Sequence, residues 1–200
     1  MTSTRHGSAV IEFPSDLEIL ITREFHAPIQ LVVDVLTKAE HARNTIAPFG
    51  EEVTECSFDT RVGGNYHYTF VTGDGRAMTF YGTFLEVKPP TRIVDTWQYD
   101  GWPDVKAVET VDLHEANGVT TLTWRLAFSD QAGRDHMNKF DGIEANFDNI
   151  EDYLRSLLEE KETVSALMRF ARSSNDTRLE SGEWAMSASR GRRRRRPPST

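Results

Sequence analysis

Residue types able to carry acid–base or metal chemistry lie far apart along this 200-residue sequence. Its six histidines stand at positions 6, 26, 41, 67, 114 and 136, without the spacing of metal ligands. His136 is considered as a general base, because imidazole titrates near neutral pH and this one precedes an expected long helix, where a cavity mouth would lie. His67 alternates with tyrosines on an expected strand and is predicted to face solvent. The histidines therefore indicate no metal site.

Acidic and thiol side chains leave more than one interpretation open. Asp95 shares an expected strand face with Trp97, where it either recognises a cationic or hydroxylated ligand or sits at a solvated strand edge; we favour the edge. Glu144 and Asp148 are spaced i, i+4 on an expected helix, which predicts a solvated helix face. Cys56 is predicted to be a small apolar residue of a strand rather than a nucleophile.

Motifs of the common enzyme classes are absent from the sequence. It contains no G-x-S-x-G, H-E-x-x-H, P-loop, Rossmann glycine pattern or C-x-x-C. We therefore predict no catalytic residue, no bound metal and no cofactor. A non-enzymatic role is favoured, although the sequence does not decide the question.

Charge is distributed unevenly along the chain. Residues 1–160 carry a net charge of −14 and residues 161–200 carry +6, for a total of −8. An acidic body is poorly suited to a phosphate backbone. The Arg192–Arg196 run is the exception: it is a candidate for binding nucleic acid, anionic lipid or an acidic partner, for a weak contact with the acidic body, or for an unselected tail. With one cysteine, no signal sequence and no apolar run that spans a membrane, the chain is predicted to be soluble and cytoplasmic.

Large aromatic side chains recur at every second position of several expected strands, which places them on one face of a sheet. An apolar face of this kind either packs as a plain core or lines a ligand pocket with a few polar groups. The side chains predicted to line such a cavity are Tyr66, Tyr68, Phe70, Asp95, Trp97, Tyr99, Trp124, Phe140, Ile143 and Phe147. For any single ring, simple core packing is the interpretation that we favour.

The elements that position these residues are well marked. A strand is expected at residues 17–25, two short helical stretches at 28–37 and 38–46, and further strands at about 51–60, 64–72, 77–88, 91–100, 105–115 and 118–129. Turn signals separate them, including Asp74-Gly75 and Asn117-Gly118. No helix interrupts the last six strands, so the sequence predicts an α+β fold with a curved, seven-stranded antiparallel sheet. Gly63 and Gly64 are predicted to supply a bend or bulge where the sheet curls.

The C-terminal part changes to helical periodicity. Apolar residues recur every three or four positions between Phe140 and Leu158, which predicts an amphipathic helix over about 135–160 that covers the sheet. Beyond it the chain is rich in Ser and Arg, so residues 161–200 are predicted to be mostly disordered. Residues 1–8 are predicted to be a flexible N-terminus, and residues 9–160 one domain.

Six blocks of the sequence together resemble a known family. They are ITREFHAPIQLVVDVLT, FDTRVGGNYHYTF, GDGR, FYGTFLEVKPPTRIVDTW, GVTTLTWRLAF and GIEANFDNIEDYLRSLLEE. They resemble the SRPBCC superfamily, which includes START domains and the birch-pollen allergen, and within it the relatives of the C-terminal domain of the activator of the heat-shock-protein-90 ATPase. The similarity covers about residues 10–160.

This resemblance implies a helix-grip fold with a cavity between the sheet and the long helix. The sequence departs from the family pattern at His26, where an Asp is usual, at Asn44 and Thr45, which stand near usual tryptophans, and at Asp95, where an aromatic residue is common. Loss of the tryptophans is expected to widen or wet one end of the cavity.

Three functions follow from these observations as hypotheses. The first is binding of a small, largely hydrophobic or aromatic ligand, in a stress- or metabolite-related role. The second, implied by the resemblance, is an interaction protein that modulates a chaperone ATPase. The third is a cyclase- or hydrolase-like enzyme acting on a polyketide-type substrate. The sequence is compatible with a monomer or a homodimer, and fold similarity alone does not choose among the three functions.

Overall fold

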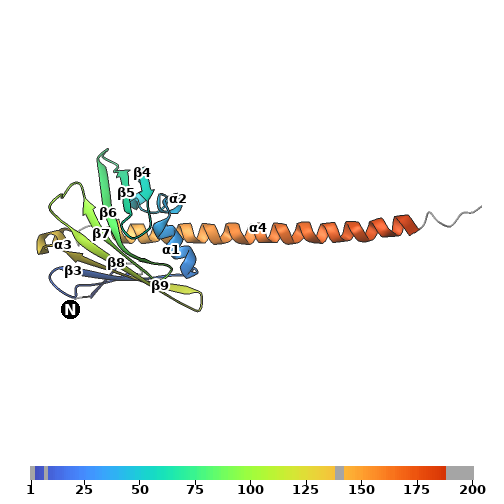
Figure 1. The fold of residues 1–200 in the computed structure, drawn as a ribbon, viewed down its shortest axis with the longest axis horizontal. Coiled ribbons are helices and arrows are strands. Elements are labelled where there is room, and N and C mark those ends of the chain that lie inside the picture. Colours follow the sequence, from blue (N-terminus) through green and yellow to red (C-terminus); the bar gives the residue numbers. More distant parts are fainter. Residues whose placement is uncertain (1–2, 7–8, 138–141, 188–200) are drawn as a thin grey trace, which may run out of the picture. The chain divides into compact units, whose positions relative to one another are not determined.

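The computed structural model describes residues 3–6, 9–137 and 142–187 (Figure 1). Its strands are β1 (Ser3–His6), β2 (Ala9–Glu12), β3 (Glu18–Phe25), β4 (Glu52–Phe58), β5 (Asn65–Val71), β6 (Ala77–Lys88), β7 (Arg92–Tyr99), β8 (Ala107–Ala116) and β9 (Val119–Phe128). Its helices are α1 (Ile29–Thr37), α2 (Ala39–Ala42), the 3₁₀ helix η1 (Pro48–Gly50), α3 (Gln131–Met137) and α4 (Gly142–Ser187). The chain forms two compact units, Met1–Ser156 and Leu157–Thr200.

The strands of the first unit form one antiparallel sheet in the order β1-β2-β3-β9-β8-β7-β6-β5-β4. All seven predicted strands are present, as β3 to β9, so the predicted α+β fold is confirmed. The strand count is higher than predicted, because the described residues contain two further short strands. Residues 9–12 pair with β3, and Ser3–His6 pairs with them in turn, within the segment predicted to be flexible.

Alternation along the strands creates the inner face of this sheet. On β3, Ile19, Ile21 and Phe25 are buried, as the sequence predicts for a half-buried strand. Arg23 has the same parity and is therefore also carried inward, where only 5% of its surface remains exposed. The inner face is thus apolar with a few embedded charged groups.

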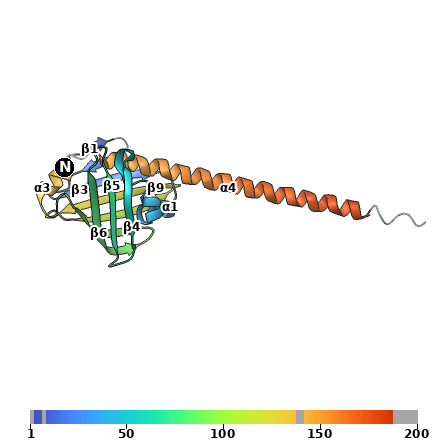
Figure 2. The same cartoon turned by 90° about the horizontal axis from the view of Figure 1, so that it is seen from above.

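The sheet curls strongly. Figure 2 shows β4, β5 and β6 running across the direction of β3 and β9. Register shifts between Val53 and Glu55, and between Phe84 and Glu86, mark bulges that bend the strands. Gly63 and Gly64 lie beside the second bulge but in the turn before β5: Gly63 has a φ of 78°, and its N–H donates to the Phe84 carbonyl. These two glycines therefore shape the turn at the curl rather than interrupting β5.

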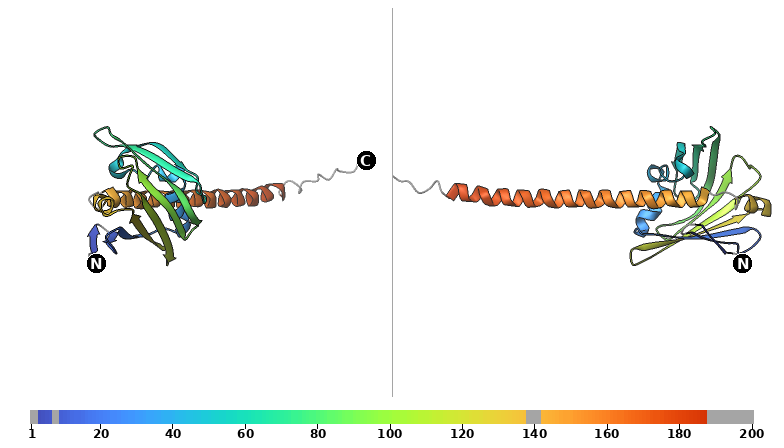
Figure 3. Two further views of the ribbon diagram at one scale, coloured as in Figure 1. Left: turned by 60° about the vertical axis from the view of Figure 1, so that its left-hand side comes forward. Right: turned by 180° about the vertical axis from the view of Figure 1, so that it is seen from behind.

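The first turns of α4 lie against the concave side of the sheet (Figure 3). Ile143, Phe147, Ile150 and Leu154 are buried there at the predicted helical spacing. The single predicted helix over 135–160 is instead two helices, α3 and α4, and residues 138–141 between them, with the candidate Phe140, lie outside the described residues.

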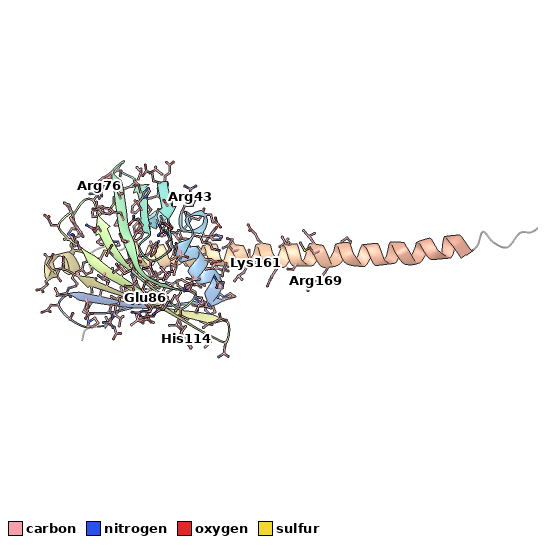
Figure 4. All side chains as sticks on the ribbon, in the orientation of Figure 1. Arg43, Arg76, Glu86, His114, Lys161 and Arg169 are labelled. Atoms are coloured by element: carbon pink, nitrogen blue, oxygen red, sulfur yellow. The ribbon has the colours of Figure 1, made fainter. Side chains whose placement is uncertain are left out.

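Helix α4 continues to Ser187, well past the expected end near residue 160. Residues 161–180 contain no Gly or Pro, and 11 of these 20 residues are Glu, Lys, Arg, Ala, Leu or Met, which are good helix formers; this explains a helix where composition suggested disorder. Lys161 and Arg169 extend from this part of α4 in Figure 4, and Val164, Leu167, Met168 and Phe170 are exposed. Within the described residues, no helix combines the length and the apolarity needed to cross a membrane.

Candidate functional site

A cavity of about 140 Å³ lies between the concave face of the sheet and the first turns of α4. Its wall includes a row of aromatic rings from neighbouring strands, in which Phe58 stacks on Tyr66 at 5.6 Å and Tyr66 on Tyr68 at 6.3 Å between centroids. Gly82 makes room for this row: a Cβ there would stand 2.7 Å from Tyr66 Cε1 and 1.7 Å from the Thr96 carbonyl oxygen. The opposite wall comes from Asn146, Phe147 and Ile150 of α4.

A second cavity of about 110 Å³ adjoins the first. Both are lined by Ile46, Tyr68, Glu109, Trp124 and Asn146, so these side chains stand between the two spaces. Asn146 also holds the wall in place, since its Nδ2 donates to the Thr45 carbonyl, and Asn149 Nδ2 donates to the Ala47 carbonyl at 2.7 Å. The segment after α2 is thereby fixed to α4.

Two carboxyl side chains meet on the floor of the first cavity. Asp95 on β7 and Glu109 on β8 are directly paired residues in the sheet register, and both point to the concave side. Asp95 is 7% exposed. The hydroxyl of Tyr66 donates to the Thr96 carbonyl at 3.1 Å and lies 3.5 Å from Asp95 Oδ1. Among the described residues that line this cavity, none is basic.

Burial changes the protonation of this pair. Loss of solvent raises the pKa of the Asp95 carboxyl to about 7, with hydrogen bonds from Glu109 and Tyr66 acting in the opposite direction. Burial, and then the adjacent charge of Asp95, raises the pKa of the Glu109 carboxyl well above its usual range. Two buried carboxyls in contact cannot both ionise cheaply, so near neutral pH they hold at least one proton between them.

Trp124 provides a polar atom that has no partner. Its Nε1 is buried without a hydrogen-bond acceptor, and Glu109 Oε1 is likewise buried without a donor unless the acid pair supplies its own proton. Val111 and Glu109 occupy alternate positions on β8, and Trp124 is the register partner of Val111 on the adjacent strand β9. Asp95, Glu109 and Trp124, which come from the adjacent strands β7, β8 and β9, are called the polar corner of the cavity below; Thr37, Asn146 and the tyrosine hydroxyls are the other polar groups of its lining.

The buried Arg23 forms a second charged cluster, with two acidic side chains of α4. Its guanidinium donates to Glu144 at 2.6 Å and to Asp148 at 3.2 Å, and lies 5.9 Å from the centroid of the Phe147 ring. The prediction that Glu144 and Asp148 form a purely solvated helix face is therefore wrong for Glu144, whose side chain is 20% exposed. Arg23 has the same parity as the buried Ile19, Ile21 and Phe25, but only the packing of α4 on β3 shows its partners.

A third cavity of about 450 Å³ lies at the other end of β6 and β7, beside α3. Trp97, Tyr99 and Trp102 line it together with His136, whose ring centroid is 3.5 Å from that of Trp102. His136 thus belongs to a different cavity from Asp95, and the two are not brought together as an acid–base pair. Among the described residues, no group of three or more His, Cys, Asp or Glu side chains is placed to hold a metal ion.

Comparison with protein families gives a match over residues 26–155, to the family described as Activator of Hsp90 ATPase homolog 1-like protein. The match spans more than half of the chain and includes both halves of the cavity wall. The chain belongs to this family.

Solved structures agree with this assignment at the level of the fold. A Rhodobacter sphaeroides protein is similar with a TM-score of 0.67 at 21% identity, covering 74% of this chain and 99% of that one. A Nitrosomonas europaea protein has a TM-score of 0.65 at 20% identity, with the same coverage, and a Mycobacterium smegmatis protein has 0.64 at 19%, covering 78% and 97%. A search of curated proteins finds no match.

Within this family fold, the predicted cavity residues are distributed over three spaces. Tyr66, Asp95 and Phe147 line the first cavity, Phe70 and Ile143 the second, Tyr68 and Trp124 both, Trp97 the second and third, and Tyr99 the third. Their role in ligand binding remains a prediction. His67 is exposed, as expected. The interpretation of Asp95 as a solvated edge residue is wrong, because β7 is an internal strand and its side chain points under α4.

Glu109 is the residue that the sequence analysis missed. It alternates with Ala107, Val111 and Leu113, and Ala107 and Leu113 are buried on the concave side. This parity was readable in the sequence and could have placed Glu109 inward. What the sequence could not show is the register that sets it opposite Asp95.

Proposed function

We propose that this chain binds a small, largely hydrophobic or aromatic molecule in the two adjoining cavities between the sheet and α4. The observation that carries the proposal is their combination of size and lining. A cavity of roughly 150 Å³ lined by apolar side chains is large enough to bind benzene. The first cavity has about 140 Å³ and the second about 110 Å³, so the two suit a compound of one or two rings.

Support for binding rather than plain packing comes from the lining itself. Phe147 is fully buried at 2% exposure, whereas Tyr68 and Trp124 retain exposed surface although they face the interior. Incomplete burial of inward aromatic rings is what an unfilled pocket produces, and a mainly apolar pocket with a few convergent polar groups is the usual form of a small-molecule site. A cytoplasmic location belongs to the same proposal and is supported by the single free cysteine, Cys56.

The test is an amide NMR titration of the full chain with fatty acids, flavonoids and polyketide-like aromatics. Saturable shifts at Tyr68, Trp124 and Asn146, with little change at His67 on the outer face, are expected. A response confined to Trp102 and His136 would move the site to the third cavity. No saturable response to any compound would contradict the proposal.

Family membership supports a second candidate, modulation of a chaperone ATPase. It is separable from ligand binding by one measurement, the ATPase rate of an Hsp90-type chaperone with increasing amounts of the chain. A saturable change in rate would support this role, and an unchanged rate with no co-sedimentation would exclude it.

A further inference from the structure

The polar corner of the cavity carries information on the chemistry of the ligand, an inference that rests on the proposed function. Glu109 and Trp124 line both cavities, so a compound that occupies either space lies next to them. Asp95 stands beside Glu109 on the neighbouring strand. A buried polar group without a partner costs about 1–3 kcal/mol, so a ligand that supplies the partner gains affinity and one that does not leaves the cost in place.

The partner must satisfy two different needs. Trp124 Nε1 only donates, so it requires an acceptor on the ligand. The acid pair, when it holds a single proton, has carboxylate oxygens that accept, and Glu109 Oε1 is among the buried oxygens without a donor from another side chain. A hydroxyl group does both, because its oxygen accepts from the indole while its hydrogen is donated to the carboxylate.

Charged ligand groups fit this corner less well. An ammonium group would suit the acid pair but has no acceptor for the Trp124 N–H. A carboxylate would accept from the indole but would stand against the negative charge of the pair, and none of the described residues that line the first cavity is basic. The aromatic wall of Phe58, Tyr66 and Tyr68 favours a flat ring as the carrier of the hydroxyl.

We propose that the cavity ligand is an uncharged phenol-type ring compound whose hydroxyl accepts a hydrogen bond from Trp124 Nε1 and donates one to the Asp95–Glu109 pair. Tyr66, which touches Asp95 through its own hydroxyl, is a positioning residue for the pair. The hydroxyl of the ligand then distinguishes it from other ring compounds, whereas the aromatic wall contributes affinity for any flat ring.

Four probes of similar size test this proposal on the full chain: 2-naphthol, naphthalene, 2-naphthoate and protonated 2-aminotetralin, each followed by calorimetry and tryptophan fluorescence. Transfer from water alone favours naphthalene, because burying a hydroxyl without hydrogen bonds is costly. We expect the reverse order, with 2-naphthol bound at least tenfold more tightly than naphthalene and than either ion.

Two variants locate the effect. Trp124→Phe keeps a ring but removes the N–H, and is expected to weaken the binding of 2-naphthol about three- to tenfold more than it weakens the binding of naphthalene. Glu109→Met should remove the preference for the hydroxyl. Trp102→Phe and the exposed Glu52→Met are the matched controls and should change neither affinity. If Glu109→Met does not fold, the Trp124→Phe comparison decides alone.

The outcomes separate the two proposals. Equal binding of 2-naphthol and naphthalene, or tighter binding of naphthalene, would overturn the hydroxyl inference and leave the cavity as an apolar binding site. Tighter binding of protonated 2-aminotetralin or of 2-naphthoate would overturn it in favour of a charged ligand. Failure of all four probes to bind would overturn the inference, whereas the proposed function is decided by the separate NMR titration with fatty acids, flavonoids and polyketide-like aromatics.

Discussion

Two groups of acidic side chains lie near Phe147, one beside Arg23 and one on the floor of the first cavity, and they are neutralised in different ways. Near β3, Glu144 and Asp148 meet the guanidinium of Arg23 at 2.6 and 3.2 Å. On β7 and β8, Asp95 and Glu109 meet each other and the Tyr66 hydroxyl, with no basic partner among the described residues that line the cavity, and shared protons take the place of a cation. The first group has its counter-charge built in and ties the helix to the sheet. The second lies at a cavity and includes a carboxyl oxygen without a hydrogen-bond donor, so a ligand that supplies the donor gains affinity there.

Phe147 lies near both groups, and its removal is expected to have the largest effect. Its ring makes edge contacts with Phe25 at 6.2 Å and Trp124 at 6.1 Å, and it is 2% exposed. Phe147→Ala should lower the free energy of unfolding by about 3–5 kcal/mol, measured by urea denaturation. Val164→Ala on an exposed part of the same helix is the control. An unchanged free energy of unfolding in Phe147→Ala would mean that the ring of Phe147 is not packed between α4 and the sheet.

The acid pair makes stability depend on pH. Because folding raises the pKa of Asp95 to about 7, its contribution is fully present below the unfolded pKa, near 4, and is lost as the pH rises through 7. Between pH 5 and pH 8 the loss from Asp95 amounts to about 3 kcal/mol, at 1.36 kcal/mol per pKa unit.

Other groups near the pair do not titrate over this range. Tyr66 and Tyr68 on β5 and Cys56 on β4 keep their protons, since burial raises the pKa of each. The Asp95→Asn/Glu109→Gln double variant should therefore show a flatter profile of unfolding free energy against pH. Parallel profiles for the double variant and the wild-type chain would contradict the assignment.

The Arg23 group, which is Arg23 with Glu144 and Asp148, should be destabilised by a substitution that removes its cation. Arg23→Met keeps most of the packing volume but removes the partly buried Arg23–Glu144 ion pair. Breaking a fully buried pair costs about 3–5 kcal/mol, and we expect about 2 kcal/mol here because Asp148 is 63% exposed. Addition of Glu144→Gln to Arg23→Met should restore part of the loss in thermal melts, and no restoration would show that packing rather than charge sets the cost.

The smallest effect is expected from the end of the chain. Removal of residues 171–200 should change the unfolding free energy of the β-sheet unit by less than about 0.5 kcal/mol, within the range of surface changes. Calorimetry of the truncated and full chains measures this directly. A large drop in melting temperature would mean that the stability of the sheet depends on the C-terminal end, and the boundary predicted at residue 160 would have to move.

Much of the fold could be read from the sequence, because period and turn chemistry are local properties. The alternation in β3, β5, β7 and β9 marked the inward residues, and seven of the strands were placed within a few residues. Short pairing segments such as β1 and β2 carry too few residues for a period, and they were missed as strands. The end of α4 was misplaced, since weak amphipathicity does not prevent a helix built from strong helix formers.

Local patterns determined which side chains this protein turns inward, including Arg23 and Asp95, while tertiary structure alone decided what they meet. The position of a residue along its strand predicts which face of the sheet its side chain points to, but not which residue it contacts. The register of β7 on β8 places Glu109 opposite Asp95, and the packing of α4 on β3 brings Glu144 to Arg23 from 121 residues away. Desolvation acts on Glu144 and on the Asp95–Glu109 pair alike, but only Glu144 has a cation, Arg23, beside it. Glu144 therefore forms an ion pair, whereas Asp95 and Glu109 share protons at the cavity.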